Sequence, residues 1–167
     1  MTPSKADLLA ALRASADEVV RIVAALPPER LEEGRYENGW NGRQILAHLA
    51  SIEWTYPRLV DLAREAPPAS AGTTGEPPTR TMRGGNDAYN DRQVSRRAHL
   101  SAADLIAEFE KNRAATIQAV EATEDALFSR PIRSAGGRTG TLASVFYEVA
   151  VLHVLGHARD IEEERPD

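Results

Sequence analysis

The chain has 167 residues, 42% hydrophobic and 27% charged, which is ordinary for one globular domain over residues 1–167 and excludes an intrinsically disordered chain. Its formal net charge of −5 gives no basic excess, so nucleic acid is not an expected partner. Cysteine is absent, which excludes disulfides, zinc–thiolate sites and a cysteine nucleophile. The N-terminal stretch carries acids where a secretory signal needs an apolar run, and no segment reaches about 18 apolar residues, so a soluble, cytoplasmic, membrane-free protein is expected.

Two helices are predicted in the first part of the chain. The first begins at Ser4, which heads a capping-box pattern, and ends at Pro27. The second begins at Asn41, and its apolar residues recur every three or four positions up to Pro67. Pro57 falls inside this second helix and is expected to kink it, because proline removes a backbone donor.

A long connection separates the second helix from the third. Residues 67–85 are rich in Pro, Gly, Ser and Thr and are predicted to form a loop, and residues 86–97 are predicted to form a short helix. A connection of this length allows the chain to cross back along a bundle. We therefore expect the second and third long helices to run parallel.

Two further helices complete the predicted fold. The third begins at Ser101, in another capping box, and its pattern stops before Pro131. The fourth begins at Thr139 or Thr141, after a Gly-Gly turn, and runs to about Glu164. No strand-like alternation bounded by hairpin turns is present. The predicted fold class is an all-α four-helix bundle with a long crossover between helices two and three.

Three histidines lie at positions where a water-soluble bundle normally places aliphatic side chains. His153 and His157 continue the apolar spacing of the fourth predicted helix, which puts both on its inward face one turn apart. Side chains at this spacing have Cβ atoms roughly 6 Å apart, so two imidazoles can reach one ion. His48 lies between two isoleucines on the second helix and is also predicted to face inward.

The levels of these histidines along the bundle agree. At ~1.5 Å per residue, His48 lies about 9 Å from the start of helix two, and the pair lies roughly 10–17 Å from the end of helix four. If these two helices are antiparallel, the heights match to within about two turns. A single histidine on an apolar stripe is more often a core residue bonded to a carbonyl. Three at matching levels favour a metal site with His48, His153 and His157 as ligands.

Three segments resemble the DinB/YfiT-like superfamily of bacterial four-helix bundles. They are W-N-G-R-Q-I-L-A-H-L at 40–49, N-D-A-Y-N at 86–90 and H-V-L-G-H-A-R-D-I at 153–161. The segments S-K-A-D-L-L-A-A-L at 4–12 and L-I-A-E-F at 105–109 look like the ClbS/DfsB branch, some of whose members protect cells against a genotoxic metabolite. Another branch is the metal-binding domain of mycothiol-dependent maleylpyruvate isomerase.

The resemblance implies an up-down-down-up topology and a homodimer. It also implies that His48, His153 and His157 match the family's metal triad, although the isomerase has a carboxylate where this chain has His153. Apolar residues on more than one face of helices two and four also favour a dimer formed through helix faces. Asn86 and Asn90, in the matching N-D-A-Y-N segment, are predicted to bind substrate.

Several other residues are candidates for roles around the metal. Glu53 lies about 140° around the helix from His48 at ~3.6 residues per turn, so it is not expected to be a ligand. It is a candidate acid/base group, with a solvated or interface glutamate as the alternative. Tyr56 is a second catalytic candidate and Tyr147 a substrate-binding one, with packed core tyrosines as the alternative. Asp160 lies one turn after His157 and is predicted either to orient that imidazole or to form a surface ion pair.

Positive charge in the long connection suggests where an anionic substrate would bind. Arg83 is the predicted substrate-binding member of a group of arginines that also includes residues 80, 92, 96 and 97. Such a group is otherwise an ordinary solvated surface. His99 lies beside it and is expected to be a surface residue.

The predicted function is a metal-dependent enzyme of detoxification or stress response that acts on a small-molecule substrate. The metal either activates water for hydrolysis or binds a low-molecular-weight thiol as thiolate for transfer to an electrophile. Three imidazoles suit zinc, nickel, iron or copper, and zinc or nickel is expected. The alternative is a non-catalytic protective protein that binds a toxic small molecule or DNA.

Overall fold

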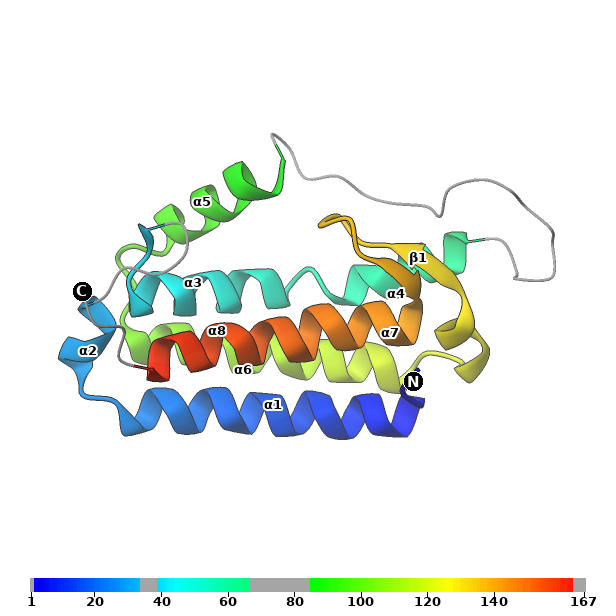
Figure 1. The fold of residues 1–167 in the computed structure, drawn as a ribbon, viewed down its shortest axis with the longest axis horizontal. Helices are drawn as coiled ribbons and strands as arrows, with labels where there is room; N and C mark the ends of the chain where they lie inside the picture. The colour runs from blue at the N-terminus through cyan, green and yellow to red at the C-terminus, as the bar shows by residue number, and fades with distance from the viewer. Residues whose placement is uncertain (1, 34–38, 67–84, 164–167) are drawn as a thin grey trace.

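Four long helical rods form the body of the molecule, and Figure 1 shows how they are arranged. The computed structural model describes residues 2–33, 39–66 and 85–163. The rods are α1 (Lys5–Ala25); α3 (Gly42–Glu53) with α4 (Pro57–Glu65); α6 (Ala102–Glu121); and α7 (Leu142–Tyr147) with η4 (Glu148–Leu152) and α8 (His153–Glu162). The predicted all-helical bundle is therefore confirmed.

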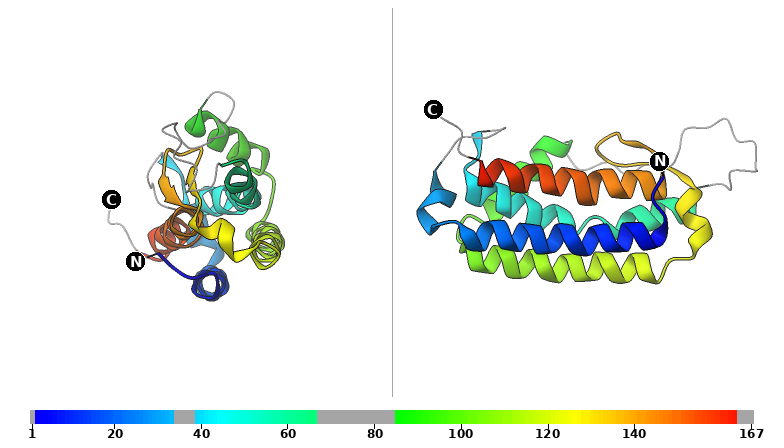
Figure 2. Two further views of the ribbon diagram at one scale, coloured as in Figure 1. Left: turned by 90° about the vertical axis from the view of Figure 1, so that its right-hand side faces the viewer. Right: turned by 60° about the horizontal axis from the view of Figure 1, so that its bottom comes forward.

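The order and direction of the rods are those of an up-down-down-up bundle. The α3–α4 and α6 rods run in one direction, and α1 and the α7–α8 rod run in the other (Figures 1 and 2). α3 packs against α6 and α1 packs against α8, so parallel rods are neighbours. The parallel arrangement of the second and third rods, predicted from the long connection, is confirmed.

Local capping chemistry sets where the rods begin. Ser4, Asn41 and Ser101 each form a complete capping box, in which the cap side chain accepts from the third helical amide and the residue at that position bonds back. Thr141, one of the two predicted starts of the last rod, accepts a hydrogen bond from the Ser144 amide. These contacts satisfy amides that have no partner inside the helix.

The second rod breaks between α3 and α4, as Pro57 predicts. Residues 54–56 form a turn, and Pro57 occupies the first position of α4, where its missing N–H removes no helical hydrogen bond. The break places Glu53 at the end of α3 and Tyr56 at the start of α4. Both side chains point into the bundle interior, where they are 0% and 3% exposed.

The prediction that the chain has no strands was wrong. β1 (Pro131–Arg133) pairs antiparallel with β2 (Thr139–Thr141), and the hairpin stands outside the bundle beside α7 (Figure 1). Each strand has three residues, which is too short for an alternating pattern to be visible in the sequence. α6 also ends earlier than its predicted limit at Pro131, because the chain forms the 3₁₀ helix η3 (Asp125–Ser129) before the hairpin.

Two short helices lie at the periphery. α2 (Pro28–Glu32), which was not predicted, begins with proline at a position that favours helix starts. α5 (Asn86–Arg96) confirms the predicted short helix and packs against α3 (Figure 1). The predicted loop before it lies largely in residues 67–84, outside the described part of the chain. Across the described ranges, no helix combines the length and apolar content needed to span a membrane.

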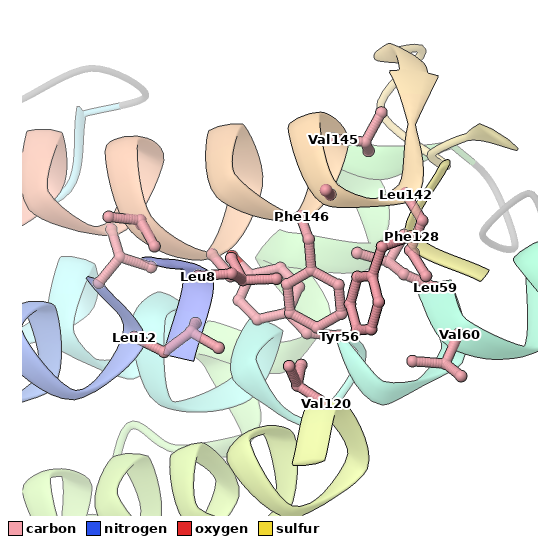
Figure 3. Close-up of a cluster of buried hydrophobic side chains, with 14 of the residues drawn as sticks. Leu8, Leu12, Tyr56, Leu59, Val60, Val120, Phe128, Leu142, Val145 and Phe146 are labelled. Carbon is pink, nitrogen blue, oxygen red and sulfur yellow. The ribbon is translucent and has the colours of Figure 1, made fainter. Parts of the chain in front are cut away.

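The core lies between the four rods and has an aromatic centre. Tyr56 and Phe146 pack with ring centroids 6.4 Å apart, and Phe128 of η3 lies beside them (Figure 3). Leucines and valines from all four rods surround these rings. A second cluster, which includes Trp40, Ile45 and Ile161, closes the other end of the bundle. The three histidines are held on α3 and α8, two rods that contact each other directly.

Candidate metal centre

Three imidazoles meet where α3 faces α8. The His48 ring centroid lies 5.6 Å from that of His153 and 5.1 Å from that of His157, and the last two are 4.6 Å apart. Nε2 of His153 lies 3.1 Å from Nε2 of His157. One nitrogen from each ring can be chosen so that all three lie within 4.8 Å of one another. The three predicted ligands are therefore adjacent in space.

The two α8 histidines lie beside the buried row of the last rod, not on it. The buried row runs through Phe146, Ala150, Val154 and Ala158. The prediction that the imidazoles occupy the inward face was therefore incorrect: His153 is exposed and His157 half-buried. The reason is η4, a turn of π-helix, whose extra residue shifts the buried row by one position relative to regular spacing.

His48 is the buried member of the cluster. Its side chain is 2% exposed, and the ring of Trp40 packs against it with centroids 5.2 Å apart. Burial, followed by the neighbouring His157 and His153, lowers the pKa of His48 to about 3. Within the described residues, Nδ1 of His48 has no hydrogen-bond partner. A neutral, buried imidazole with an unpartnered nitrogen is suited to binding a cation.

His153 is also held in its neutral form. Although its ring is partly exposed, the surrounding protein and then His157 lower the pKa of His153 to about 4, while a hydrogen bond to the Val149 carbonyl acts in the opposite direction. Neutral imidazole is the form that coordinates a metal. At neutral pH these two imidazoles would therefore not need to lose a proton before an ion binds.

The residues present fit a divalent transition metal. Nitrogens about 2.0–2.1 Å from a tetrahedral ion lie ~3.3–3.4 Å apart, close to the 3.1 Å between the two Nε2 atoms on α8. The remaining nitrogen–nitrogen separations in the cluster are at most 4.8 Å. Three nitrogen donors without a thiolate correspond to the type of metal site in which the fourth coordination position stays open for water or substrate.

A pocket of about 750 Å³ opens beside the cluster. His48 and His153 form part of its wall, together with the α3–α4 break, α5, the loop of the hairpin and η4. Ile52, Leu59 and Leu62 contribute apolar surface. The volume lies within the ~300–1,000 Å³ range of small-molecule sites.

The structure places some predicted substrate residues at this pocket and others elsewhere. Asn86, Asn90 and Tyr56 line it, whereas Tyr147 of α7 is not among the lining residues. Arg83 lies outside the described residues.

The remaining predicted residues lie away from the pocket wall. Glu53 is not among the residues that line the pocket, and its carboxylate forms an ion pair with Arg113. Asp160 is half-buried on α8 one turn after His157, and His99 is exposed, as predicted.

Sequence reasoning missed Arg113, which is 2% exposed in the bundle core. Its Nε lies 2.8 Å from Glu53 Oε1, without hydrogen-bond alignment, and its Nη2 donates to Glu53 Oε2 at 2.9 Å. Arg113 also donates to the carbonyls of Leu12 and Ala150. Burial raises the pKa of Glu53, while Arg113 opposes that shift. The available signal was the position of Arg113 on the apolar stripe that runs from Phe109 to Val120.

Fold and site together define a four-helix bundle with parallel neighbouring rods and a histidine cluster able to hold a metal. A family model described as the DinB superfamily matches residues 11–161. The chain belongs to the DinB superfamily. Among curated proteins, none matches the chain.

Two solved proteins share the fold. Mycothiol-dependent maleylpyruvate isomerase superposes with a TM-score of 0.72 at 18% identity, over 95% of this chain and 61% of the isomerase. This chain thus spans about three fifths of that protein. YfiT from Bacillus subtilis, described as a probable metal-dependent hydrolase with an unusual four-helix bundle topology, gives a TM-score of 0.70 at 17% identity, over 94% of this chain and 83% of YfiT. Identities this low establish the common fold alone.

Proposed function

We propose that this chain is a metal-dependent enzyme of detoxification or stress response that acts on a small organic molecule. The observation that carries the proposal is the convergence of His48, His153 and His157, two of which, His48 and His153, line a pocket large enough for such a molecule. These residues would hold one divalent ion, with zinc or nickel as the expected metals. When bound, the metal would supply a Lewis acid that lowers the pKa of a coordinated water or thiol.

The pocket wall suggests which kind of substrate the chain would bind. Apolar side chains of Ile52, Leu59 and Leu62 line the pocket. Arg58, whose guanidinium stacks on the Trp54 ring at 4.2 Å, and Arg138 supply positive charge. A molecule with an apolar body and a hydrogen-bond-accepting or anionic group matches this combination.

Proton transfer would fall to carboxylates that reach the pocket. The side chain of Glu53 is fully buried against Arg113, and the hydroxyl of Tyr56 donates to the Val149 carbonyl at 2.6 Å, so neither is retained as the proton-transfer group. Asp87 and Glu148 both line the pocket. We assign the acid/base role to these two carboxylates. Oε2 of Glu148 lies 3.8 Å from Nε of Arg138.

Two chemistries follow from a metal-activated nucleophile. Hydrolysis by metal-bound water is supported by the fold shared with a probable metal-dependent hydrolase. Transfer of a low-molecular-weight thiol is supported by the fold shared with a mycothiol-dependent isomerase. Capture of a toxic small molecule or DNA without turnover is the non-catalytic alternative.

One set of assays separates these possibilities. Metal-free protein is reloaded with zinc or nickel and tested against ester and amide substrates, and separately against electrophiles with a small thiol. We expect turnover that requires metal and is lost in His153→Ala but kept in His99→Ala, since His99 is exposed away from the cluster. Tight binding of the electrophile without product would instead indicate capture. Turnover that does not depend on metal would contradict the proposal.

A further inference from the structure

The last rod contains a turn of π-helix, η4, immediately before His153. The His153 amide donates to the carbonyl of Glu148, five residues back, instead of four. Such turns are rare and recur at functional sites, and each changes the direction in which the following side chains point. The orientation of His153 and His157 relative to His48 therefore depends on this turn.

Side chains from two other rods bind the carbonyls of η4. The Tyr56 hydroxyl, at the α3–α4 break, donates to the Val149 carbonyl at 2.6 Å. Nη2 of Arg113, on α6, donates to the Ala150 carbonyl at 2.8 Å. Side chains that insert into the hydrogen-bond ladder of a helix are a recognised cause of local distortion. Two such donors act on consecutive carbonyls here.

Tyr56 remains a hydrogen-bond donor because its hydroxyl stays protonated. Its side chain is 3% exposed, and its ring packs against Phe146 in the core (Figure 3). Burial raises the pKa of Tyr56 well above its usual value, so the hydroxyl keeps its proton at any physiological pH. The ring is held by packing, and the hydroxyl is held by one carbonyl.

The Val149 carbonyl connects Tyr56 to the histidine cluster. It also accepts a hydrogen bond from the His153 imidazole, which partly offsets the lowering of that residue's pKa. Because Nε2 of His153 faces Nε2 of His157 at 3.1 Å, the nitrogen that bonds Val149 is Nδ1. A proton on Nδ1 leaves the lone pair of Nε2 directed at the cluster. Partners of this kind fix the tautomer and ring orientation of metal-binding histidines.

We propose that Tyr56 is a positioning residue of the metal centre, which orients His153 by holding the Val149 carbonyl, with Arg113 supporting the same turn at Ala150. The proposal rests on the proposed function, because it assumes that the cluster binds an ion. It assigns Tyr56 a role through the backbone and not through contact with substrate.

The test is Co²⁺ titration of metal-free Tyr56→Phe, which keeps the ring and removes only the hydroxyl. We expect Co²⁺ to bind about 10–100-fold more weakly than to wild type, as is typical when the partner behind a ligand is lost. We also expect a changed Co²⁺ absorption spectrum, which a general loss of stability would not produce. Thr116→Val is the matched control, because it removes a fully buried hydroxyl that bonds Asn112 and Glu53 carbonyls instead of η4.

The outcomes separate this inference from the proposed function. Tyr56→Phe that binds Co²⁺ like wild type, or Thr116→Val that weakens binding equally, would overturn the positioning role alone. Wild type that binds no Co²⁺ would overturn the proposed function and the inference together. Long-range ¹H–¹⁵N NMR of the metal-free wild type adds a measurement that needs no variant. It should show the His153 proton on Nδ1, and a proton on Nε2 would overturn the inference.

Discussion

The side chain of Asn86 joins α5 to the hairpin loop by donating from Nδ2 to the carbonyl of Ala135 at 3.1 Å. Asn86 and Ala135 both line the pocket, so this hydrogen bond ties two of its walls together. Neither residue belongs to the rods that carry the histidines. The bond should therefore influence the shape of the pocket without influencing the metal ligands.

Replacing Asn86 by Ala should loosen the pocket wall. Loss of one partly buried hydrogen bond costs roughly 0.5–1.5 kcal/mol locally, so amide hydrogen exchange in residues 134–138 should become faster. The affinity for Co²⁺ should change by less than about twofold, because metal affinity depends mainly on the ligands and on the groups that hydrogen-bond to them. Asn90→Ala is the control, since Asn90 lines the same pocket and, among described residues, makes no hydrogen bond to the hairpin. Equal exchange in the two variants would show that the Asn86 contact does not hold the wall.

Metal content tests the assignment of ligands. We expect about one divalent metal per chain in protein purified without an affinity tag, measured by elemental analysis. His153→Ala should lose this metal, because two imidazoles bind far more weakly than three. His99→Ala should keep it. Full metal content in His153→Ala would contradict the ligand set.

Removal of the metal should destabilise the folded chain. A ligand present at a hundredfold excess over its Kd stabilises by about 2.7 kcal/mol, so chelation at pH 7.5 should lower the melting temperature by roughly 5–10 °C. In His48→Ala the chelator should have little effect. A chelator effect of equal size in both proteins would show that His48 is only a packed core histidine.

The metal-free protein should lose stability as the pH falls below about 6.5. Burial lowers the folded-state pKa of His48 to about 3, well below the ordinary value of 6.5 for a histidine. The unfolded chain therefore takes up the proton first, and acid favours unfolding. At pH 5 this effect amounts to about 2 kcal/mol for His48 alone.

His48→Gln provides the comparison, because Glu53, whose pKa is raised by burial, acts in the opposite sense in both proteins. The difference between the free energies of unfolding of wild type and His48→Gln, measured from pH 7.5 to pH 4, isolates the histidine. A difference that does not vary with pH would contradict the burial-driven shift.

Glu53→Gln should destabilise the bundle strongly. The substitution leaves the Arg113 guanidinium, 2% exposed, without its counter-charge in the core. Breaking a buried pair in this way costs about 3–5 kcal/mol. Glu18→Gln is the control, because Glu18 pairs with Arg21 on the surface of α1, and it should change stability little. Chemical denaturation of both variants measures the contrast, and similar losses would show that burial of the Arg113 pair adds nothing.

The homodimer stays a prediction. Trp54 and Leu152 are the large apolar side chains most exposed to solvent among the described residues, at 54% and 51%. Light scattering at micromolar concentration should show twice the chain mass, and a single-chain mass would refute the prediction.

The features that the sequence predicted well are local or strictly periodic. Ser4, Asn41 and Ser101 begin helices through contacts three residues away, so the capping pattern alone located them. The histidine cluster could be predicted because the rise per residue of a helix converts a position in the sequence into a height along the rod. The long connection predicted parallel rods for a purely geometric reason.

The features that the sequence did not reveal depend on departures from periodicity or on distant partners. The π-turn adds one residue to the last rod, so the spacing of Phe146, Val149 and His153 suggested a buried row that the structure places at Phe146, Ala150 and Val154. Three-residue strands carry no usable alternation. The pairing of Glu53 with Arg113 joins residues that only the folded bundle brings together.

One part of the pocket wall comes from segments outside the rods that carry the histidine cluster. His48, His153 and His157 stand on rods whose packing constrains them, whereas Asn86, Asn90 and Ala135 come from segments inserted between rods. Connections accept insertion and substitution far more readily than packed helices. Changes in α5 or in the hairpin can therefore alter this part of the pocket wall while the rods that carry the three histidines stay as they are. The same bundle can thus present different pocket walls beside one unchanged histidine cluster.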